Sequence, residues 1–272
     1  MDYPWLNGKA VLITGAGGGI GSAAAEAFLA CGATVLGADL ELSWADSLKR
    51  RIGAASSNLH AIRADVTDSN DVAAAVERMV SIHGTLDIAI AAAGIQAVGS
   101  TEDTPEEVWQ RVMSINLTGT WLLCKHSVTA MKKGGGGTLL LLGSTAGLHP
   151  RANLAAYCVS KAGVSMLARV LGRETAADGI RVVAVCPTGT ETPLLRGMIA
   201  GLEAHEAGAD QVKAQMGAAN EATAQADAGL MAGKPVQRWL EPAEVASVLT
   251  WLTSPAVSMV TGSSIPLDFG SV

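Results

Sequence analysis

Short apolar segments alternate with longer amphipathic ones along most of the chain. The short segments carry Val, Ile, Leu and Ala at consecutive positions, which indicates strands that are buried on both faces. Seven segments have this character: Ala10–Thr14, Thr34–Ala38, Leu59–Ala64, Leu86–Ala92, Thr138–Leu142, Arg181–Cys186 and Ser264–Leu267. Helical patterns lie between them, among them Ile20–Cys31, Asn70–Ile82, Pro105–Ser114, Ala155–Ala177 and Pro242–Leu252. This alternation predicts an α/β fold with a doubly wound parallel sheet of about seven strands and helices on both faces.

The pattern runs without a dividing linker or an internal repeat, so we expect a single Rossmann-type domain over residues 1–272. One segment, residues 193–235, departs from it. That segment is rich in Ala, Gly, Met and acidic residues and has no strand pattern, although it lies between two predicted core strands. Long excursions of this kind commonly cover a site. We therefore predict a helical substrate lid over residues 193–235.

Charge and cysteine content narrow the class of protein further. The formal net charge is −6 and the sequence pI is about 5.4, which leaves no basic face for nucleic acid. No apolar stretch approaches the roughly 20 residues of a membrane span, and the first residues lack the basic start of a secretory signal. The four cysteines are far apart and form no CxxC pair. We expect them to be reduced in a cytoplasmic protein, with no metal site.

A glycine-rich turn joins the first predicted strand to the first predicted helix. The segment Thr14-Gly15-Ala16-Gly17-Gly18-Gly19-Ile20-Gly21 ends the strand and opens an Ala-rich helix. Glycines allow a tight turn and the close approach of a diphosphate, and a helix N-terminus offers free N–H groups. A turn without a ligand would explain the same letters, but the strand–turn–helix context favours a dinucleotide. The expected contacts are Gly15, Gly17, Gly19, Ile20 and Gly21.

Acidic residues at the ends of the next two predicted strands bear on the choice of dinucleotide. Asp39 follows Gly21 by 18 residues, and a carboxylate there can accept both ribose hydroxyls of NAD while repelling the 2′-phosphate of NADP. Glu41 adds negative charge, and no Lys or Arg follows closely. Capping of the next helix is the alternative role for Asp39. At the end of the third strand, Asp65-Val66 could reach the adenine amino group or form a turn. The expected cofactor is NAD.

Three later motifs complete a resemblance to a known family. The glycine turn fits the pattern TGxxxGxG, and Ile115–Gly119, Leu142–Gly147 and Tyr157–Lys161 follow in order. These motifs are similar to the asparagine, serine and YxxxK segments of the short-chain dehydrogenase/reductase family, in its compact single-domain branch. A lone YxxxK arises easily by chance, but the ordered set does not. Ser144 precedes Tyr157 by 13 residues, which is the spacing of the family, and the resemblance covers essentially the whole chain.

The resemblance implies a catalytic set of Asn116, Ser144, Tyr157 and Lys161. Tyr157 would exchange the alcohol proton, Ser144 would hold the substrate oxygen, and Asn116 would order a water that joins Lys161 to solvent. Lys161 lies four residues after Tyr157, on the same helix face. A positive charge about 4 Å away is worth on the order of 4 kcal/mol at an effective dielectric near 20. We therefore expect Lys161 to lower the pKa of Tyr157 toward the useful range for a general base.

The resemblance also implies cofactor contacts from Ala93, Gly94, Tyr157, Lys161, Pro187, Thr190 and Thr192. Two positions depart from the family pattern. Ala92 stands where the family has asparagine, which removes a hydrogen bond that braces two strands. Thr188 follows Pro187 where the family has glycine, and Gly189 comes one place later. The resemblance therefore does not fix the backbone conformation of residues 188–190. Thr192 nevertheless keeps its place five residues after Pro187.

These observations predict an NAD(H)-dependent oxidoreductase that interconverts a secondary alcohol and a ketone. One alternative is an NADPH-linked 3-oxoacyl-carrier reductase, against which Asp39 argues. The other is a non-catalytic NAD-binding sensor, against which the intact catalytic set argues. The resemblance further implies a homotetramer that uses the helix at Ala155–Ala177. The small residues Ala156, Gly163 and Ala168 on that helix would permit close helix contact.

The nature of the substrate stays open at this point. By position, Gln96, His149 and Asn153 should line a substrate pocket and suggest a polar small molecule. Leu194, Leu195 and Met198 suggest an apolar one. His149 is more often a structural hydrogen bonder than a catalyst. Arg151 and Arg196 could pair with an anionic group, although solvated arginines are the more ordinary interpretation.

Overall fold

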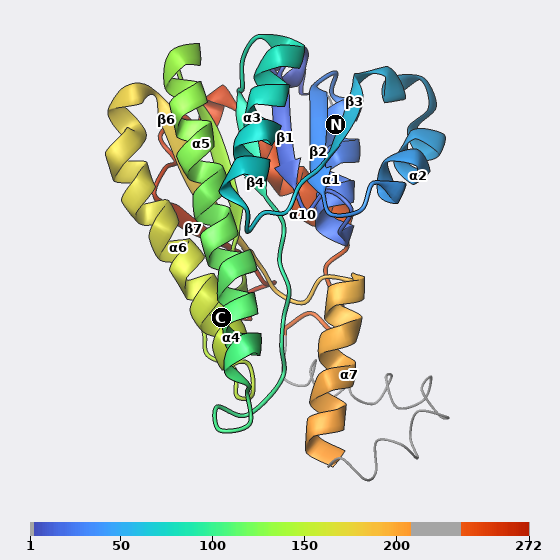
Figure 1. Cartoon of the computed structure of the whole chain (residues 1–272), viewed down its shortest axis with the longest axis vertical. Helices are drawn as coiled ribbons and strands as arrows, with labels where there is room; N and C mark the ends of the chain where they lie inside the picture. The colour runs from blue at the N-terminus through green and yellow to red at the C-terminus, as the bar shows by residue number, and fades with distance from the viewer. Residues whose placement is uncertain (1–2, 208–234, 272) are drawn as a thin grey trace.

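The computed structural model describes residues 3–207 and 235–271. Its centre is a seven-stranded parallel sheet with the order β3-β2-β1-β4-β5-β6-β7 (Figure 1). The strands are β1 (Ala10–Thr14), β2 (Thr34–Asp39), β3 (Leu59–Arg63), β4 (Ile88–Ala91), β5 (Gly137–Leu142), β6 (Ile180–Pro187) and β7 (Ser263–Leu267). The strand order reverses between β1 and β4, and a ligand crevice lies outside the carboxyl ends of the strands at such a point. The doubly wound fold is confirmed, and each predicted strand is present with ends shifted by at most two residues.

Helices cover both faces of the sheet. One layer contains α1 (Gly19–Ala30), α2 (Ser43–Ile52) and α10 (Pro242–Trp251). The other contains α3 (Ser69–His83), α4 (Glu106–Met113), α5 (Gly119–Gly134) and α6 (Ala155–Thr175). Short 3-10 turns fill the connections at Pro4–Leu6, Gly53–Asn58, Thr145–Gly147, Ala176–Asp178 and Pro255–Val257. No helix in the described ranges is long and apolar enough to cross a membrane.

The core consists of two apolar clusters, one on each face of the sheet. Leu12 of β1 packs into the cluster under α3, α5 and α6, while its neighbours Val11 and Ile13 pack under α1 and α10. Because successive side chains of a strand point to opposite faces, a strand covered on both sides must be apolar at every position. This explains why the sequences of the strands are continuous runs of apolar residues.

Two helices were not in the expected set, α2 and α5. The expected helix Pro105–Ser114 corresponds to α4, and one π turn, Ser114–Thr118, carries the chain from α4 directly into α5. Gly119 is the first residue of α5 and packs against another element. A Cβ there would lie 2.9 Å from the side chain of Val66. π turns inside helices are rare and often mark functional positions, and this one carries Asn116.

The segment predicted as a lid is helical where the structure describes it. Residues 193–207 form α7 (Pro193–Ala207), which projects beyond the sheet in Figure 1. Leu195 and Ile199 of α7 are buried, and a Cβ on Gly201 would lie 3.0 Å from the side chain of Val98. The remainder of the predicted segment includes residues 208–234, which lie outside the described residues.

We expected the small residues of α6 to contact another subunit, but in the structure they pack within this chain. Ala156 and Ala168 are buried in the subunit, and Gly163 packs against Leu117. They permit close approach of elements within this chain, so the expectation that they contact another subunit is wrong. The exposed apolar residues of the helix are instead Val159, Met166 and Val170.

Candidate active site

The glycine turn after β1 packs tightly against the chain after β4. Gly15 has a φ of +69°, and a Cβ there would meet the backbone nitrogen of Ala93 at 2.4 Å. A Cβ on Gly21 would meet the Gly15 carbonyl oxygen at 2.1 Å, and one on Gly19 would meet the Thr192 methyl at 2.5 Å. Helix α1 then begins without a side-chain cap on its free N–H groups. The turn therefore has the shape and the donors of a diphosphate cradle.

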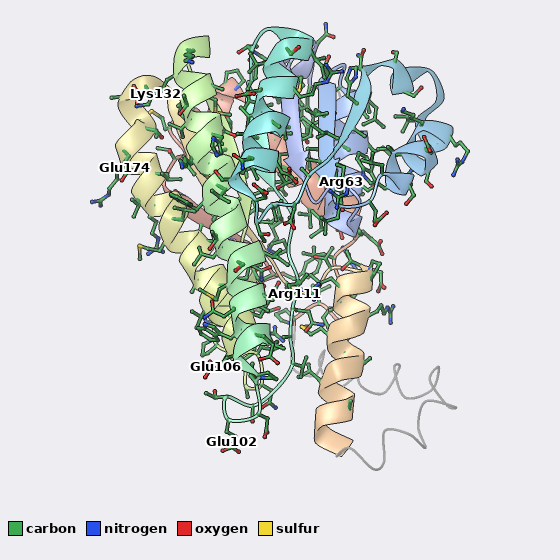
Figure 2. All side chains as sticks on the ribbon, in the orientation of Figure 1. Arg63, Glu102, Glu106, Arg111, Lys132 and Glu174 are labelled. Carbon is green, nitrogen blue, oxygen red and sulfur yellow. The ribbon has the colours of Figure 1, made fainter. Side chains whose placement is uncertain are left out.

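Asp39 lies beside this cradle, at the carboxyl end of β2. Its carboxylate accepts hydrogen bonds from Gly17 N and Leu40 N, both at 2.8 Å. Asp39 and Glu41 line one cavity together with Gly15, Gly17 and the indole of Trp44. Arg111 at the end of α4 lines the same cavity (Figure 2). A dinucleotide fits here, because glycines, free backbone donors and the Asp39 carboxylate line one cavity.

Asp65 and Val66 also line this cavity, together with Ala93 and Gly94. The Asp65 carboxylate accepts hydrogen bonds from the Thr67 backbone N at 2.8 Å and the Thr67 hydroxyl at 2.7 Å. These bonds hold the pKa of Asp65 below its usual value. Asp65 thus forms the turn that the sequence allowed, in a position that also faces the cavity.

The replacement of asparagine by Ala92 leaves the two strands joined. The backbone N–H of Ala92 donates to Thr14 O at 3.0 Å, and the Thr14 hydroxyl donates to Ile90 O at 3.4 Å. The main chain therefore maintains the contact between β1 and β4 without the family's side chain.

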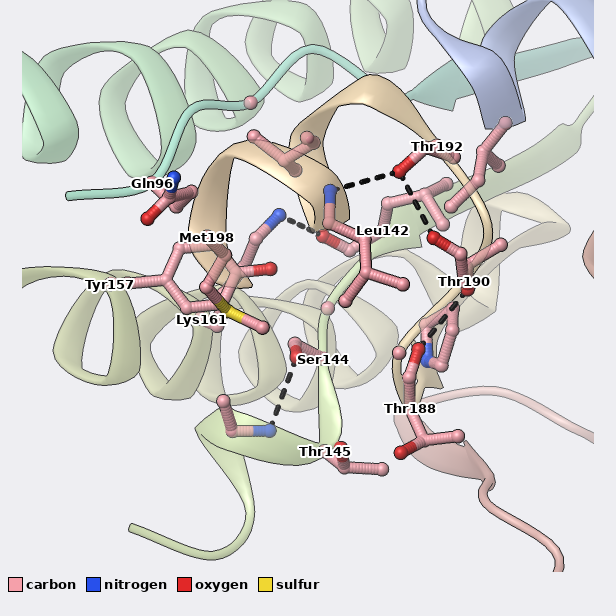
Figure 3. Close-up of a pocket in the computed structure, with 18 of the residues that line it drawn as sticks. Gln96, Leu142, Ser144, Thr145, Tyr157, Lys161, Thr188, Thr190, Thr192 and Met198 are labelled. Carbon is pink, nitrogen blue, oxygen red and sulfur yellow. Dashed lines mark hydrogen bonds between the residues drawn. The ribbon is translucent and has the colours of Figure 1, made fainter. Parts of the chain in front are cut away.

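Ser144, Tyr157 and Lys161 line a second cavity, which adjoins the first through Ala92 and Gly94 (Figure 3). Ser144 follows β5, and its Oγ accepts a hydrogen bond from Ala146 N at 3.1 Å, which leaves its O–H free to donate. Tyr157 and Lys161 come from the first turns of α6. The Lys161 Nζ is buried, donates to Leu142 O at 2.7 Å and lies 5.8 Å from the centre of the Tyr157 ring.

Asn116 is fully buried next to these groups. Its carboxamide exchanges two hydrogen bonds with the Ile95 backbone, both 2.8 Å long, and also donates to Ser160 Oγ at 3.0 Å. A Cβ on Gly94 would lie 3.4 Å from Asn116 Oδ1 and 3.5 Å from Lys161 Nζ, so both groups face one point. Ser160 was missed as a positioning residue, although its place directly before Lys161 was the available signal. The four expected catalytic residues thus come together at one site.

The expected effect of Lys161 on Tyr157 is wrong for this structure. Burial raises the pKa of Tyr157, and hydrogen bonding with the Ser144 hydroxyl opposes that rise. Burial also lowers the pKa of Lys161 to about 8. The estimate from the sequence assumed an ammonium about 4 Å from the phenol, whereas the Nζ is directed to the Leu142 carbonyl. Desolvation is therefore the largest influence on the pKa of both groups.

This burial predicts a measurable cost to stability. An ordinary lysine has a pKa near 10.4, so a folded value of about 8 disfavours the native state below pH 8 by on the order of 3 kcal/mol. The penalty disappears as the pH rises toward the unfolded value. Lys161→Met should therefore be more stable than the wild type at pH 7, by less than that amount because the bond to Leu142 O is lost.

Urea unfolding at pH 7, 8, 9 and 10 measures this difference. The advantage of the variant should be greatest at pH 7 and should shrink steadily toward pH 10. The exposed Lys133→Met variant controls for the loss of one positive charge. A difference between Lys161→Met and wild type that does not change with pH would contradict the explanation.

The chain after β6 takes a defined path despite Thr188. Pro187, Thr190 and Thr192 line the second cavity, and hydrogen bonds of 3.1 Å link Thr192 Oγ1 to Thr190 O and Thr190 Oγ1 to Thr188 O (Figure 3). The shifted glycine has a local cause, because a Cβ on Gly189 would meet the Trp239 ring at 2.3 Å. Trp239 closes the cavity at this point, and the sequence analysis did not identify it.

The substrate side of this second cavity is mainly apolar. Its walls include Leu154, Leu194, Leu195, Met198 and Trp239. Gln96 also lines this cavity, as expected (Figure 3). His149 and Asn153 do not line it. His149 is exposed, and Asn153 adopts a φ of +61° in the loop before α6, where its carbonyl accepts from Gly99 N at 2.9 Å.

This fold and site define an oxidoreductase that binds a nicotinamide dinucleotide. A family model of short chain dehydrogenases matches residues 9–202, and the chain belongs to the short-chain dehydrogenase/reductase family. It is 34% identical over 263 residues to the cis-4-hydroxycyclohexanecarboxylate dehydrogenase of Sinomonas cyclohexanicum, covering 96% of both chains. It is also 34% identical to the cyclohexanol dehydrogenase of Acinetobacter sp. (strain SE19), covering 97% of this chain and 94% of the relative.

Solved structures agree with this assignment. Levodione reductase superposes with a TM-score of 0.87 at 26% identity, covering 97% of each chain. The 3-ketoacyl-(acyl-carrier-protein) reductase from Brucella melitensis, complexed with NADH, superposes with a TM-score of 0.82 at 31% identity, covering 98% of this chain and 99% of that one. The protein is therefore an oxidoreductase of this family, with relatives that act on alcohols and ketones.

Proposed function

We propose that this protein is an NAD(H)-dependent dehydrogenase that interconverts a secondary alcohol and the corresponding ketone. The observation that carries the proposal is the convergence of Ser144, Tyr157 and Lys161 on a mainly apolar cavity that adjoins the glycine cradle. A hydroxyl donor, a phenol and a buried ammonium at one end of an apolar cavity suit the binding and deprotonation of a carbinol.

Each residue has a separate task in oxidation. The Ser144 O–H donates to the substrate oxygen and holds the carbinol, while Tyr157 takes the hydroxyl proton. Lys161, whose Nζ donates to Leu142 O, binds the nicotinamide ribose. Asn116, directed toward the same point as Lys161, orders the water that returns the proton to solvent. Bound NAD⁺ supplies the hydride acceptor, which none of these side chains can replace.

The cavity beside β2 supports NAD over NADP. Asp39 and Glu41 place two carboxylates at the position expected for the adenosine ribose. A 2′-phosphate would bring like charges together there. The guanidinium lining the described part of this cavity, that of Arg111, comes from α4 and not from the end of β2.

The apolar walls and the named relatives support alicyclic alcohols as the first substrates to test. The experiment uses purified protein with NAD⁺ or NADP⁺ and a panel of cyclohexanols, linear secondary alcohols, sugars and hydroxy acids. The absorbance of the reduced cofactor is followed at alkaline pH. We expect NADH formation with at least one secondary alcohol. Tight NAD binding without turnover on any substrate would favour the sensor alternative.

The acyl-carrier reductase alternative has its own outcome in the same assay. For this alternative, reduction is measured instead of oxidation, with a 3-oxoacyl thioester as substrate and NADPH as hydride donor. Faster turnover of this pair than of any ketone with NADH would replace our proposal. The carboxylates of Asp39 and Glu41 oppose that outcome.

We also propose that α7 covers bound substrate. A separate proposal concerns assembly, namely that the protein forms a homotetramer. The exposed apolar residues of α6 and α5, Val159, Met166, Val170 and Trp121, support an interface on this side of the subunit. Met166→Glu should lower the mass measured by light scattering at micromolar concentration, because it places a charge in the apolar contact. A wild-type protein that is already a monomer would refute this assembly.

A further inference from the structure

Two side chains in the substrate cavity carry polar groups that have no partner among the described residues. Arg151, in the loop before α6, and Gln96, after β4, both line the cavity. No hydrogen bond or ion pair links the Arg151 guanidinium to another residue of the described ranges, although the side chain is half-buried. The Gln96 Oε1 is completely buried and has no hydrogen-bond partner among them. Polar groups that are withdrawn from water in this way normally have a partner.

Arg196, the other arginine near this cavity, has such a partner. Its guanidinium makes two hydrogen bonds to the Glu191 carboxylate, of 2.7 and 2.8 Å. Glu191 and Arg196 thus neutralise one another, and neither of them lines the cavity. The sequence could not separate Arg151 from Arg196, but the structure does. Of the two, Arg151 has a charge available for a ligand.

The charge balance of the cavity favours an anion. Its described lining contains Arg151 and Lys161 but no aspartate or glutamate. Lys161 is buried and directed to Leu142 O, so Arg151 supplies the accessible charge. The positive charge of Arg151 is close enough to Tyr157 to act on that phenol. A ligand that reaches Arg151 can therefore also reach the reacting end of the cavity.

We propose that the substrate carries a carboxylate at the end of the molecule away from its carbinol carbon, and that Arg151 binds this carboxylate. The proposal rests on the dehydrogenase function above and names its substrate class, a hydroxy acid with an apolar spacer. The buried Ser144 holds the hydroxyl end, and the half-buried Arg151 holds the acid end nearer to solvent.

A carboxylate is the anion that this arrangement fits best. A guanidinium presents parallel N–H donors that match the two oxygens of a planar carboxylate. The side chains between the two ends, such as Leu154 and Met198, are apolar and suit a hydrocarbon spacer rather than a sugar chain. Because Arg151 is half-buried, the attraction is stronger than at an open surface but is still reduced by salt.

The test compares matched substrates that differ only in charge. Hydroxycyclohexanecarboxylates are assayed with NAD⁺ beside the corresponding carboxamides and cyclohexanol, with wild type, Arg151→Gln and Arg151→Lys. Arg78→Gln, an exposed arginine on α3, controls for the change in net charge. We expect wild type to prefer the acid at least tenfold in kcat/KM, mostly through KM. This preference should shrink as the salt concentration rises.

Arg151→Gln should reduce this preference to less than twofold, because it should lower kcat/KM for the acid far more than for cyclohexanol. Arg151→Lys should restore only part of it, because an ammonium lacks the planar fork. Arg78→Gln should keep the full preference. A wild type that does not distinguish acid from amide would overturn the proposal. So would an Arg151→Gln variant that loses activity equally on both.

A binding measurement separates this inference from the proposed function. Cyclohexanecarboxylate and cyclohexanecarboxamide, which have no hydroxyl to oxidise, are titrated calorimetrically into the protein saturated with NADH. We expect the acid to bind at least tenfold more tightly, and Arg151→Gln to abolish that difference. If the acid binds in this way but no alcohol is oxidised, the dehydrogenase function fails and the anion site stands. If alcohols are oxidised but acid and amide bind equally, the anion site fails and the function stands.

Discussion

Tyr157→Phe should lower kcat for alcohol oxidation by about two to four orders of magnitude, the usual share of a general acid–base group. The change removes the hydroxyl that faces Ser144 and the cavity and leaves the ring in place. Affinity for NAD⁺ should change little, since the glycine cradle and Asp39 are untouched. Steady-state kinetics with the best alcohol, together with calorimetric titration of NAD⁺, would measure both quantities.

The chain contains one other tyrosine, which provides a matched control. Tyr3 stacks on Trp5 with ring centres 4.9 Å apart and lines neither of the two site cavities, so Tyr3→Phe should keep full turnover. More than a tenth of wild-type turnover in Tyr157→Phe, with the chemical step limiting, would show that another group acts as the base. The same measurements test the alternative of a non-catalytic NAD-binding sensor, which tight NAD⁺ binding without turnover by wild type would favour.

The pH profile gives a second measure of the same group. Tyr157 accepts a proton only as phenolate, so the rate of alcohol oxidation should rise with pH, and the rate of ketone reduction should fall. Burial raises the pKa of Tyr157 and thus shifts the pH dependences of oxidation and of reduction to higher pH. The pKa of Lys161, about 8, means that its ammonium is lost at lower pH than the proton of Tyr157. Tyr157→Phe should abolish the rise in oxidation.

Much of the fold was predictable because its signals are local. Continuous apolar runs such as Ala10–Thr14 mark strands covered on both faces, and the glycine turn marks the crossover at β1. The helix α5 was not predicted, because the expected helix ended at Ser114, where the structure instead continues through a π turn into α5. Its contact with Val66 comes from α3's preceding loop, which is distant in the sequence. The π turn at Asn116 likewise depends on packing against Ile95.

The site was predictable where a motif fixed the spacing, and less so where burial decided the chemistry. The order Asn116, Ser144, Tyr157, Lys161 predicted a common site, and the structure brings these four side chains together. The sequence could not show that Lys161 Nζ turns to Leu142 O or that burial raises the pKa of Tyr157. These depend on a cavity formed by several elements.

The substrate pocket was the least predictable part, because its walls come from separate loops. His149 and Asn153 were expected there from their positions alone, yet neither lines the cavity. Trp239 was missed because only the fold brings it onto Gly189. Arg151 and Arg196 looked equivalent until the ion pair with Glu191 distinguished them.

The choice of cofactor should be reversible at the end of β2. Wild type should prefer NAD⁺ to NADP⁺ at least tenfold in kcat/KM, because the Asp39 carboxylate accepts ribose hydroxyls and repels a 2′-phosphate. In Asp39→Ala with Leu40→Arg, this repulsion is gone and a guanidinium takes the place of an exposed leucine. Gly17 N and Leu40 N, both bonded to Asp39 in the structure, also become available to phosphate oxygens.

The ratio of kcat/KM values for the two cofactors should therefore change by at least about 100-fold, roughly 2.7 kcal/mol, and end in favour of NADP⁺. Kinetics on one alcohol, with both dissociation constants measured by fluorescence, would separate binding from turnover. Asp46→Ala removes a carboxylate from α2 that does not line the cavity, so it should keep the NAD⁺ preference. Asp39→Asn removes the charge alone and should give an intermediate ratio. Equal or better use of NADP⁺ by wild type would show that Asp39 does not govern the choice, and that the cation at Arg111 outweighs the two carboxylates beside the ribose position.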